Sequence, residues 1–327
     1  AALRARFGPP LREGPSSQMY FDARTLGRII AVANDPRRFN LKRALLMDAL
    51  VPLFAGVHAV NYVGEHVDPV RHPDFESVDV GEPIYIVAAA RSGTTFLHRL
   101  MSLDPAFTTF TLFQTIFPTI AASELADRVM SRGGLVARLV GAFQSSVDQS
   151  FDGWEGVHDT GLASDEEDEA IWALGMATPA ILLLLPFPES FEHLRFVDRL
   201  PEKKKKRLAA TYKRVLKARL FRHPGKTLLM KNVLLPGRYE IVMRAAPRAR
   251  FVHIVRHPYD VVASSLSLFT LPWTHLAPEV YGPSETTRDF ADLMIDYYRF
   301  FFDREREAEA KGDHPFVSMR YNDLVAN

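Results

Sequence analysis

Cysteine is absent from this chain of 327 residues. Disulfide bonds and thiolate chemistry are therefore excluded, and cysteine usage gives no sign of the redox compartment. Net charge is nearly absent as well, because 40 lysines and arginines oppose 39 acidic residues. A formal charge of +1 gives no global field that would recruit nucleic acid or an anionic membrane. Any function that depends on basic residues must therefore be local.

Metal-ligand motifs and targeting signals are also lacking. The eleven histidines show no HExxH or similar spacing, and we expect no metal site. Residues 1–10 lack the long apolar run of a signal peptide, which favours a cytoplasmic protein. Two uncharged stretches, Pro105–Ser123 and Ala170–Pro188, are candidate membrane spans, but prolines interrupt both. We expect each stretch to form a buried helix or the wall of an apolar pocket.

The order of predicted elements indicates an α/β protein. Apolar residues recur at helical intervals over Phe21–Asn34 and Leu41–Val60, and the region from about 106 to 222 is mostly helical, with one helix that begins at Pro201 and Glu202. Short apolar runs typical of buried parallel strands occur at Ile84–Ala90, Thr227–Lys231, Arg250–Val255 and Phe316–Met319. We therefore predict one domain over residues 1–327. A helical segment, 1–80, precedes a core, 84–325, in which a P-loop-like central parallel β-sheet is flanked by helices and carries a large helical insertion.

A candidate anion-binding loop, RSGTTF at residues 91–96, lies between the first predicted strand and a predicted helix from Phe96 to Leu103. Successive backbone N–H groups and the helix N-terminus make such a junction suitable for a phosphate. The Walker A pattern GxxxxGK[ST] is not met, since Thr94 follows Gly93 and Ala88 stands in place of the first glycine. The loop resembles a P-loop in shape but lacks its lysine. The alternative is a strand–turn–helix junction that binds no ligand.

A second candidate phosphate site follows the predicted strand RFVHIV. Arg256 lies at the carboxyl end of this strand, where open parallel sheets bind ligands. Ser264 and Ser265 come two turns into the next helix, so they reach the site only if that helix packs back across the strand ends. Arginine and serine together suit a terminal phosphate monoester. The alternative is that Arg256 pairs with Asp260.

Together these two elements resemble the sulfotransferases that use 3'-phosphoadenosine 5'-phosphosulfate (PAPS) and release adenosine 3',5'-bisphosphate (PAP). In that family a [KR]SGTT loop after a strand binds the 5'-phosphosulfate. A second strand ends in R-x-P, with a serine eight residues after the arginine, and binds the 3'-phosphate. Arg256 and Ser264 match the second signature, as residues 91–96 match the first. The resemblance points to the bacterial, lipid-directed branch of the family.

The resemblance implies a role for each matching residue. Arg91 is expected near the bridging oxygen and the leaving phosphate, and Lys231 resembles the second basic residue, which stabilises the transferring group. Phe96 matches an aromatic that stacks on adenine, and Tyr321, in RYNDL, resembles the tyrosine of a YEDL element. The implied nucleotide-binding set is Arg91, Ser92, Gly93, Thr94, Thr95, Phe96, Arg256, Ser264 and Tyr321.

The general base departs from the family's pattern. Many members carry a histidine a few residues after the lysine strand, but this chain has KNVLLPG there. The segment SDEEDEA, Ser164–Ala170, resembles an acidic EDE-type motif, and we favour Glu167 as the base, with Glu166 next. The alternatives are a solvated helix N-terminus for the acidic run and His98 as the base. The family also finishes its 3'-phosphate site with a basic, glycine-containing segment, which either lies beyond Asn327 or is replaced by another closure in this branch.

The acceptor is expected to be hydrophobic. Phe107–Pro118 and Met176–Pro188 are apolar enough to line an acceptor pocket, although a large buried core is the alternative. Lys203–Arg207 is a candidate for peripheral contact with anionic lipid heads, or else a solvated helix start. We therefore predict metal-free transfer of a sulfuryl group from PAPS to a hydroxyl of a hydrophobic or lipid-like acceptor. The rival hypotheses are a P-loop kinase or NTPase and a catalytically inactive nucleotide-binding protein.

Overall fold

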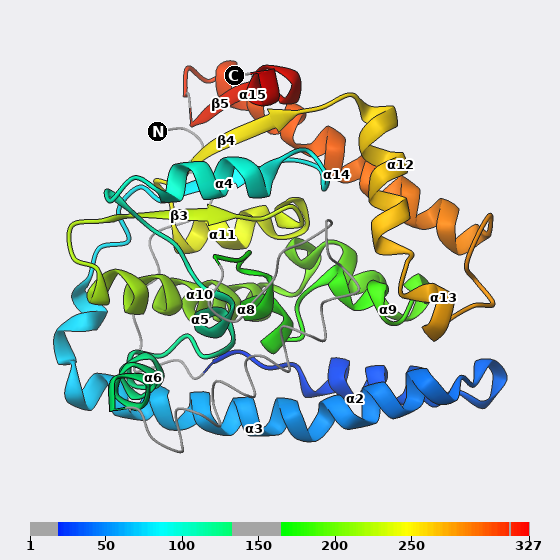
Figure 1. Cartoon of the computed structure of the whole chain (residues 1–327), viewed down its shortest axis with the longest axis horizontal. Helices are drawn as coiled ribbons and strands as arrows, with labels where there is room; N and C mark the ends of the chain where they lie inside the picture. The colour runs from blue at the N-terminus through cyan, green and yellow to red at the C-terminus, as the bar shows by residue number, and fades with distance from the viewer. Residues whose placement is uncertain (1–18, 133–164, 314, 327) are drawn as a thin grey trace.

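A five-stranded parallel sheet forms the centre of the molecule in the computed structural model, which describes residues 19–132, 165–313 and 315–326 (Figure 1). The strand order is β2-β3-β1-β4-β5, and every neighbouring pair is parallel. The strands are β1 (Ile84–Val87), β2 (Phe107–Thr108), β3 (Thr227–Lys231), β4 (Arg250–Val255) and β5 (Phe316–Arg320). The predicted fold class is confirmed.

Helices surround this sheet. In the described part of the chain, the helices α2 (Ala23–Ala33) and α3 (Leu41–Arg71) precede it, with the 3₁₀ helices η1 (Pro36–Arg38) and η2 (Pro73–Ser77). Between β1 and β3 lie α4 (Thr94–Ser102), α5 (Leu112–Ile116), α6 (Ile120–Arg132), α8 (Glu169–Leu174), η4 (Pro179–Leu183), α9 (Pro188–Arg195), η5 (Val197–Arg199) and α10 (Glu202–Arg222). After β3 come η6 (Leu235–Arg238), α11 (Tyr239–Ala245), α12 (Pro258–Phe269), α13 (Trp273–Leu276), α14 (Glu285–Glu309) and α15 (Tyr321–Ala326).

The central strand β1 is buried on both faces, as a continuous apolar run predicts. Tyr85 and Val87 belong to the apolar cluster that α10 and α11 build on one face. Ile86 packs on the other face, in a cluster with Leu97 of α4 and Leu324 of α15. Because successive side chains of a strand point to opposite faces, this alternation fixes which helices cover each side.

The amino-terminal helices lie on the side of the molecule away from β4 and β5, at the bottom of Figure 1. The helix predicted over Leu41–Val60 continues to Arg71, although Pro52 and Pro69 lie inside it. Among the described helices, α3 is the one that is long and apolar enough to cross a membrane, and 17% of its most apolar window is buried inside the molecule. This helix differs from the two candidate spans predicted from the sequence.

The two stretches that were considered as spans form short, broken elements. Pro105–Ser123 contains β2, α5 and the start of α6, and Ala170–Pro188 contains most of α8 and all of η4. Strand β2 was not predicted, because two residues carry no periodic signal. β1 ends at Val87 instead of Ala90, since the chain turns there into the anion-binding loop. Residues 1–18 of the predicted helical segment and 133–164 of the predicted insertion lie outside the described residues.

Candidate active site

Four strand ends meet at one edge of the sheet and carry the predicted site residues. β1 leads into the loop with Arg91, β3 ends at Lys231, β4 is followed by Arg256, and β5 by Tyr321. Because all of these strands are parallel, their carboxyl ends lie at the same edge, where α/β sheets of this type bind ligands. The fold therefore brings together residues that are 230 positions apart in the sequence.

The loop after β1 is shaped for close contact with its neighbours. Gly93 has φ +81°, and a Cβ atom at this position would lie 3.0 Å from the Tyr321 ring. A side chain here would therefore be strained by the backbone and pressed against an aromatic ring. The next residue, Thr94, begins α4, so the loop leads directly into the N-terminus of a nine-residue helix, where backbone N–H groups favour an anion.

Arg256 packs on the same loop. Its Nη1 donates a hydrogen bond of 2.5 Å to the Arg91 carbonyl oxygen, and its guanidinium lies 4.4 Å from the centre of the Tyr321 ring. This position over an aromatic face is a cation–π contact. No ion pair joins Arg256 to Asp260, both of which are described, so the alternative pairing is wrong. Arg256 therefore holds a positive charge against the candidate phosphate loop.

Helix α12 packs back across the strand ends, as the second phosphate element requires. Arg91 Nε donates to the Ser264 hydroxyl at 3.3 Å, and the Ser265 hydroxyl donates to the Ala90 carbonyl at 3.2 Å. Ser265 is fully buried and fastens the helix to the loop, while the half-buried Ser264 lies beside Arg91. The two predicted anion-binding elements thus form one site.

A buried hydroxyl in the loop has no partner. Ser92 is 1% exposed, and its Oγ makes no hydrogen bond in the described part of the chain. Burying a hydroxyl without a hydrogen bond costs about 1–3 kcal/mol in proteins. A phosphate or sulfate oxygen would remove this cost. The loop, its unpaired hydroxyl and the adjacent Arg256 therefore fit the anionic part of a nucleotide such as PAPS.

Lys231 is the buried cation of the site. Its side chain is 0% exposed, and the ammonium lies 3.1 Å from the Thr95 hydroxyl and 3.5 Å from the Glu167 carboxylate. A lysine is almost never buried unless it is paired. Thr95 belongs to the anion loop, so this pair places a positive charge and a carboxylate together at the loop's entrance to α4.

The Glu167 carboxylate has the properties of a proton acceptor near neutral pH. Burial raises its pKa to about 7, against the opposing effect of Lys231 and with the help of the neighbouring acidic residues. A base is most effective when its pKa lies near the working pH. Glu166 is half-buried, and its carboxylate accepts a hydrogen bond of 3.3 Å from the Glu167 backbone N–H.

The rest of the acidic run is occupied by structural contacts. Asp168 is fully buried and accepts hydrogen bonds from Tyr212, Asn232 and Trp172. Glu169 pairs with the buried Arg238. The interpretation of the run as a solvated helix start is therefore wrong for these positions. Ser164, at the beginning of the predicted motif, lies outside the described residues.

The partners of this run were not predicted from the sequence: Asn232, Arg238 and Tyr212. Asn232 directly follows Lys231, and its amide bonds Asp168 while its carbonyl oxygen accepts from Arg238. Tyr212 comes from α10, far along the chain. The available signal was the KN pair at the end of β3, since a polar residue after a buried lysine needs a partner.

Two other predicted residues, His98 and Phe96, differ in how well their surroundings suit their predicted roles. His98 is 1% exposed, and burial and then the charge of Lys231 lower its pKa to about 4, so this imidazole does not readily accept a proton. Phe96 is 54% exposed on α4, which leaves an aromatic face beside the loop uncovered. The roles assigned to Phe96 and to the other site residues stay predictions. Within the described ranges, no three His, Asp or Glu side chains are grouped as metal ligands are.

A comparison of sequences decides the family. Residues 83–327 match the model of the family described as "Sulfotransferase family". The chain belongs to the sulfotransferase family. The matched range includes the whole sheet and every predicted site residue. The suspected resemblance is confirmed, and the rival assignment as a P-loop kinase or NTPase loses its support.

Individual relatives of this family member are more distant. It is 25% identical over 258 residues to "Omega-hydroxy-beta-dihydromenaquinone-9 sulfotransferase Stf3" of Mycobacterium bovis. The aligned part covers 77% of this chain and 61% of the relative, so the chain spans about three fifths of the length of the curated protein it matches. The activity and the acceptor of this chain are therefore proposed below.

Two solved structures share the fold. Sulfotransferase STF1 from Mycobacterium tuberculosis superposes with a TM-score of 0.72 at 18% identity, covering 100% of this chain and 84% of the other. Sulfotransferase STF9 from Mycobacterium avium gives 0.68 at 19% identity, covering 100% and 79%. At these identities the likeness shows the fold alone.

Proposed function

We propose that this protein transfers the sulfuryl group of PAPS to a hydroxyl of a hydrophobic acceptor. The observation that carries the proposal is the buried Lys231 ammonium, which lies between the Thr95 hydroxyl of the anion loop and the Glu167 carboxylate. Lys231 faces the group to be transferred, and Glu167 supplies a base for the incoming alcohol.

The nucleotide is assigned to the loop and the residues packed on it. Ser92, Thr94 and Thr95 would bind the 5'-phosphosulfate, together with the N-terminus of α4. Arg256 and Ser264 would bind the 3'-phosphate, and Phe96 and Tyr321 would contact the adenine. PAPS supplies an activated sulfuryl group with PAP as the leaving group.

In this reaction the protein acts mainly by positioning the reactants and by stabilising negative charge. Arg91 and Lys231 stabilise the negative charge that develops on the bridging and equatorial oxygens in an in-line transfer. Glu167 accepts the proton of the acceptor hydroxyl, since its raised pKa suits this task near pH 7. A sulfuryl group carries less charge than a phosphoryl group, so the proposal includes no metal ion.

A hydrophobic acceptor is favoured by the named relative and by the described pocket walls. The relative's name specifies an omega-hydroxy dihydromenaquinone, which is a hydrophobic alcohol. Of the two stretches predicted to line an acceptor pocket, the one from 176 to 188 supplies residues to the large apolar pocket described below. Phe110, Gln114 and Pro118 of the other stretch line a different and much smaller cleft.

We also propose that the protein works in the cytoplasm with peripheral contact to a membrane. Exposed apolar residues follow the outer side of α3: Leu41, Leu45, Leu46, Leu53, Val60, Tyr62, Val63 and Val70. Lys42 and Arg37 are exposed near the start of this helix and have no acidic partner in the described part, which suits anionic lipid. In the earlier candidate, Lys203–Arg207, Lys204 and Lys205 already pair with acidic residues.

The experiment that tests this function is transfer from labelled PAPS to a panel of long-chain alcohols. We expect turnover by the unmodified protein and a loss of about 10²–10⁴ in kcat for Glu167→Gln, the range for removal of a general base. Glu166→Gln is the matched control and should retain most activity. Tight PAP binding without transfer to any alcohol would instead support the inactive nucleotide-binding protein.

A further inference from the structure

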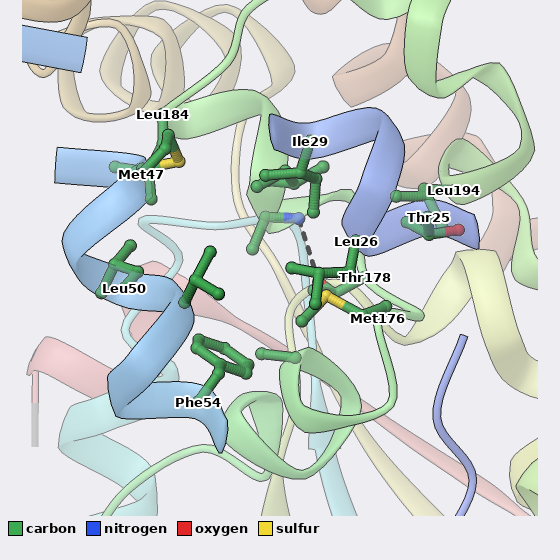
Figure 2. A pocket seen from close by; sticks show the side chains of 14 residues that line it. Thr25, Leu26, Ile29, Met47, Leu50, Phe54, Met176, Thr178, Leu184 and Leu194 are labelled. Carbon is green, nitrogen blue, oxygen red and sulfur yellow. Dashed lines mark hydrogen bonds between the residues drawn. The ribbon is translucent and has the colours of Figure 1, made fainter. Parts of the chain in front are cut away.

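An apolar pocket lies between α2, α3 and the segment that follows α8 (Figure 2). Leu26 and Ile29 of α2 face Leu50 and Phe54 of α3 across it, and Met176 closes one side. Its volume is about 170 Å³. An engineered apolar cavity of about 150 Å³ holds a benzene molecule, so this pocket holds on the order of six carbon atoms.

The polar groups in the wall are already satisfied. The Thr25 hydroxyl lies 3.1 Å from His193 Nε2, and the Thr178 hydroxyl donates to the Glu169 carboxylate. Among the residues that the structure describes, no other hydroxyl, amide or charged side chain lines the pocket. A polar ligand would therefore lose its hydration without gaining a side-chain hydrogen bond, whereas a hydrocarbon would lose nothing.

The pocket is joined to the candidate catalytic pair by α8 and by one apolar cluster. Ala173 lines the pocket and lies in α8, which begins at Glu169, two residues after Glu167. The four residues from Glu169 to Ala173 rise about 6 Å along the helix. Val233, two residues after Lys231, packs against the same cluster that contains Ile29 and Met176. Apolar side chains of one cluster thus lie both close to Lys231 in the chain and in the wall of the pocket.

We infer that this pocket holds the hydrocarbon chain of the acceptor, which makes the acceptor a long-chain alcohol. The inference rests on the proposed function for the position of the reacting hydroxyl. An extended chain covers about 3.8 Å in three bonds, so the roughly 6 Å along α8 takes about five carbons. With the roughly six carbons that fill the pocket, the preferred acceptors have chains of about a dozen carbons or more.

The test reduces the volume of the pocket by enlarging a side chain in its wall. Ala180→Leu adds a branched side chain at a half-buried position that lines the pocket, and Ala55→Leu adds the same side chain on the exposed side of α3. We measure 1-dodecanol binding by calorimetry in the presence of PAP, and then kcat/KM for 1-dodecanol and 1-hexanol. Ala180→Leu should weaken 1-dodecanol binding on the order of tenfold or more, because the new side chain takes the space of about three methylene groups.

The expected pattern is selective. Ala180→Leu should lower kcat/KM for 1-dodecanol while leaving that for 1-hexanol and the affinity for PAP unchanged, and Ala55→Leu should alter none of them. Equal effects of the two variants on 1-dodecanol binding would overturn the inference. If the unmodified protein does not bind PAP, the proposed function is contradicted instead. The difference between the two variants in 1-dodecanol binding would still test whether the pocket holds the hydrocarbon chain. Thermal denaturation of both variants verifies that each is folded.

Discussion

Single residues of the same type have different tasks in the acidic run, and their surroundings decide which. Glu167 faces one buried cation, Lys231, and keeps a carboxylate whose pKa is raised to about 7. Asp168, the next residue, is enclosed by three donors and serves the fold. The sequence DEEDE shows five equivalent acids, so the choice of Glu167 rested on resemblance, and its burial now adds a physical reason.

The first prediction concerns the pH dependence of transfer. Because the base form of Glu167 is the deprotonated one, kcat/KM should rise with pH and reach a plateau above about 7. Below that pH burial keeps the carboxyl protonated. Initial rates from pH 5 to 9 measure this, with Glu167→Gln as the comparison. A rise of the same shape in Glu167→Gln would assign the titration to another group.

The second prediction concerns the close approach at Gly93. Gly93→Ala should lower stability and weaken PAP binding at least tenfold, because the new Cβ meets both a left-handed backbone and the Tyr321 ring at 3.0 Å. Gly81→Ala is the matched control, since Gly81 has φ +69° and open space around it. Each substitution carries a backbone cost of roughly 1–2 kcal/mol. Equal PAP affinities of the two variants would contradict the prediction, because they would show that the close approach of Gly93 to the Tyr321 ring does not affect PAP binding.

Secondary-structure elements were predictable where their signals are local. The units β1–loop–α4 and β4–turn–α12 each occupy one short stretch, and both formed as expected. The continuation of α3 to Arg71 was not predictable, because polar residues in its last turns are stabilised by distant groups. Asp68 accepts backbone hydrogen bonds from Ile120 and Ala121, more than 50 residues away. A pattern of apolar spacing contains no information about such partners.

The third prediction concerns the buried hydrogen bonds of Asp168, which connect the start of α8 to α10 and to the end of β3. Asp168→Ala should lower the free energy of unfolding by about 3 kcal/mol or more, since it leaves buried donors of Tyr212 and Asn232 unpaired. Urea denaturation measures the change. Asp292→Ala, on the exposed side of α14, should remain within about 0.5 kcal/mol of the unmodified protein. A similarly small change for Asp168→Ala would mean that water replaces the lost acceptor.

At the scale of the whole molecule, the candidate nucleotide site and the apolar helix α3 lie on different sides (Figure 1). The site is at the carboxyl edge of the sheet, and α3 passes beneath the helical layer with its outer side exposed. The inner side of α3 forms one wall of the pocket, and Ala173 of α8 lies in another. Under the proposed function, a lipid acceptor would enter from the side of α3 while the nucleotide would come from water.

The fourth prediction tests the membrane contact of α3. The double variant Leu45→Asp/Leu53→Asp should bind vesicles of anionic phospholipid at least tenfold more weakly, since each leucine contributes about 1.5–3 kcal/mol when buried. Both positions are exposed, 61% and 54%, so folding should be retained. Leu103→Asp, at a 79% exposed leucine after α4, is the control. If Leu103→Asp reduces sedimentation with vesicles as much as the double variant, α3 is not the contacting surface.

The central claim is that the loop after β1 and Arg256 together bind PAPS, and calorimetric titration with PAP tests it most directly. Arg250→Ala, at the other end of β4, serves as the control variant, and ATP with magnesium as the control ligand. The account predicts tight PAP binding, weak ATP binding, and a loss of about 10- to 100-fold for Arg256→Ala, as charged hydrogen bonds contribute about 1.5–3 kcal/mol. Equal PAP affinity in Arg256→Ala and Arg250→Ala, or preference for ATP with magnesium, would contradict it.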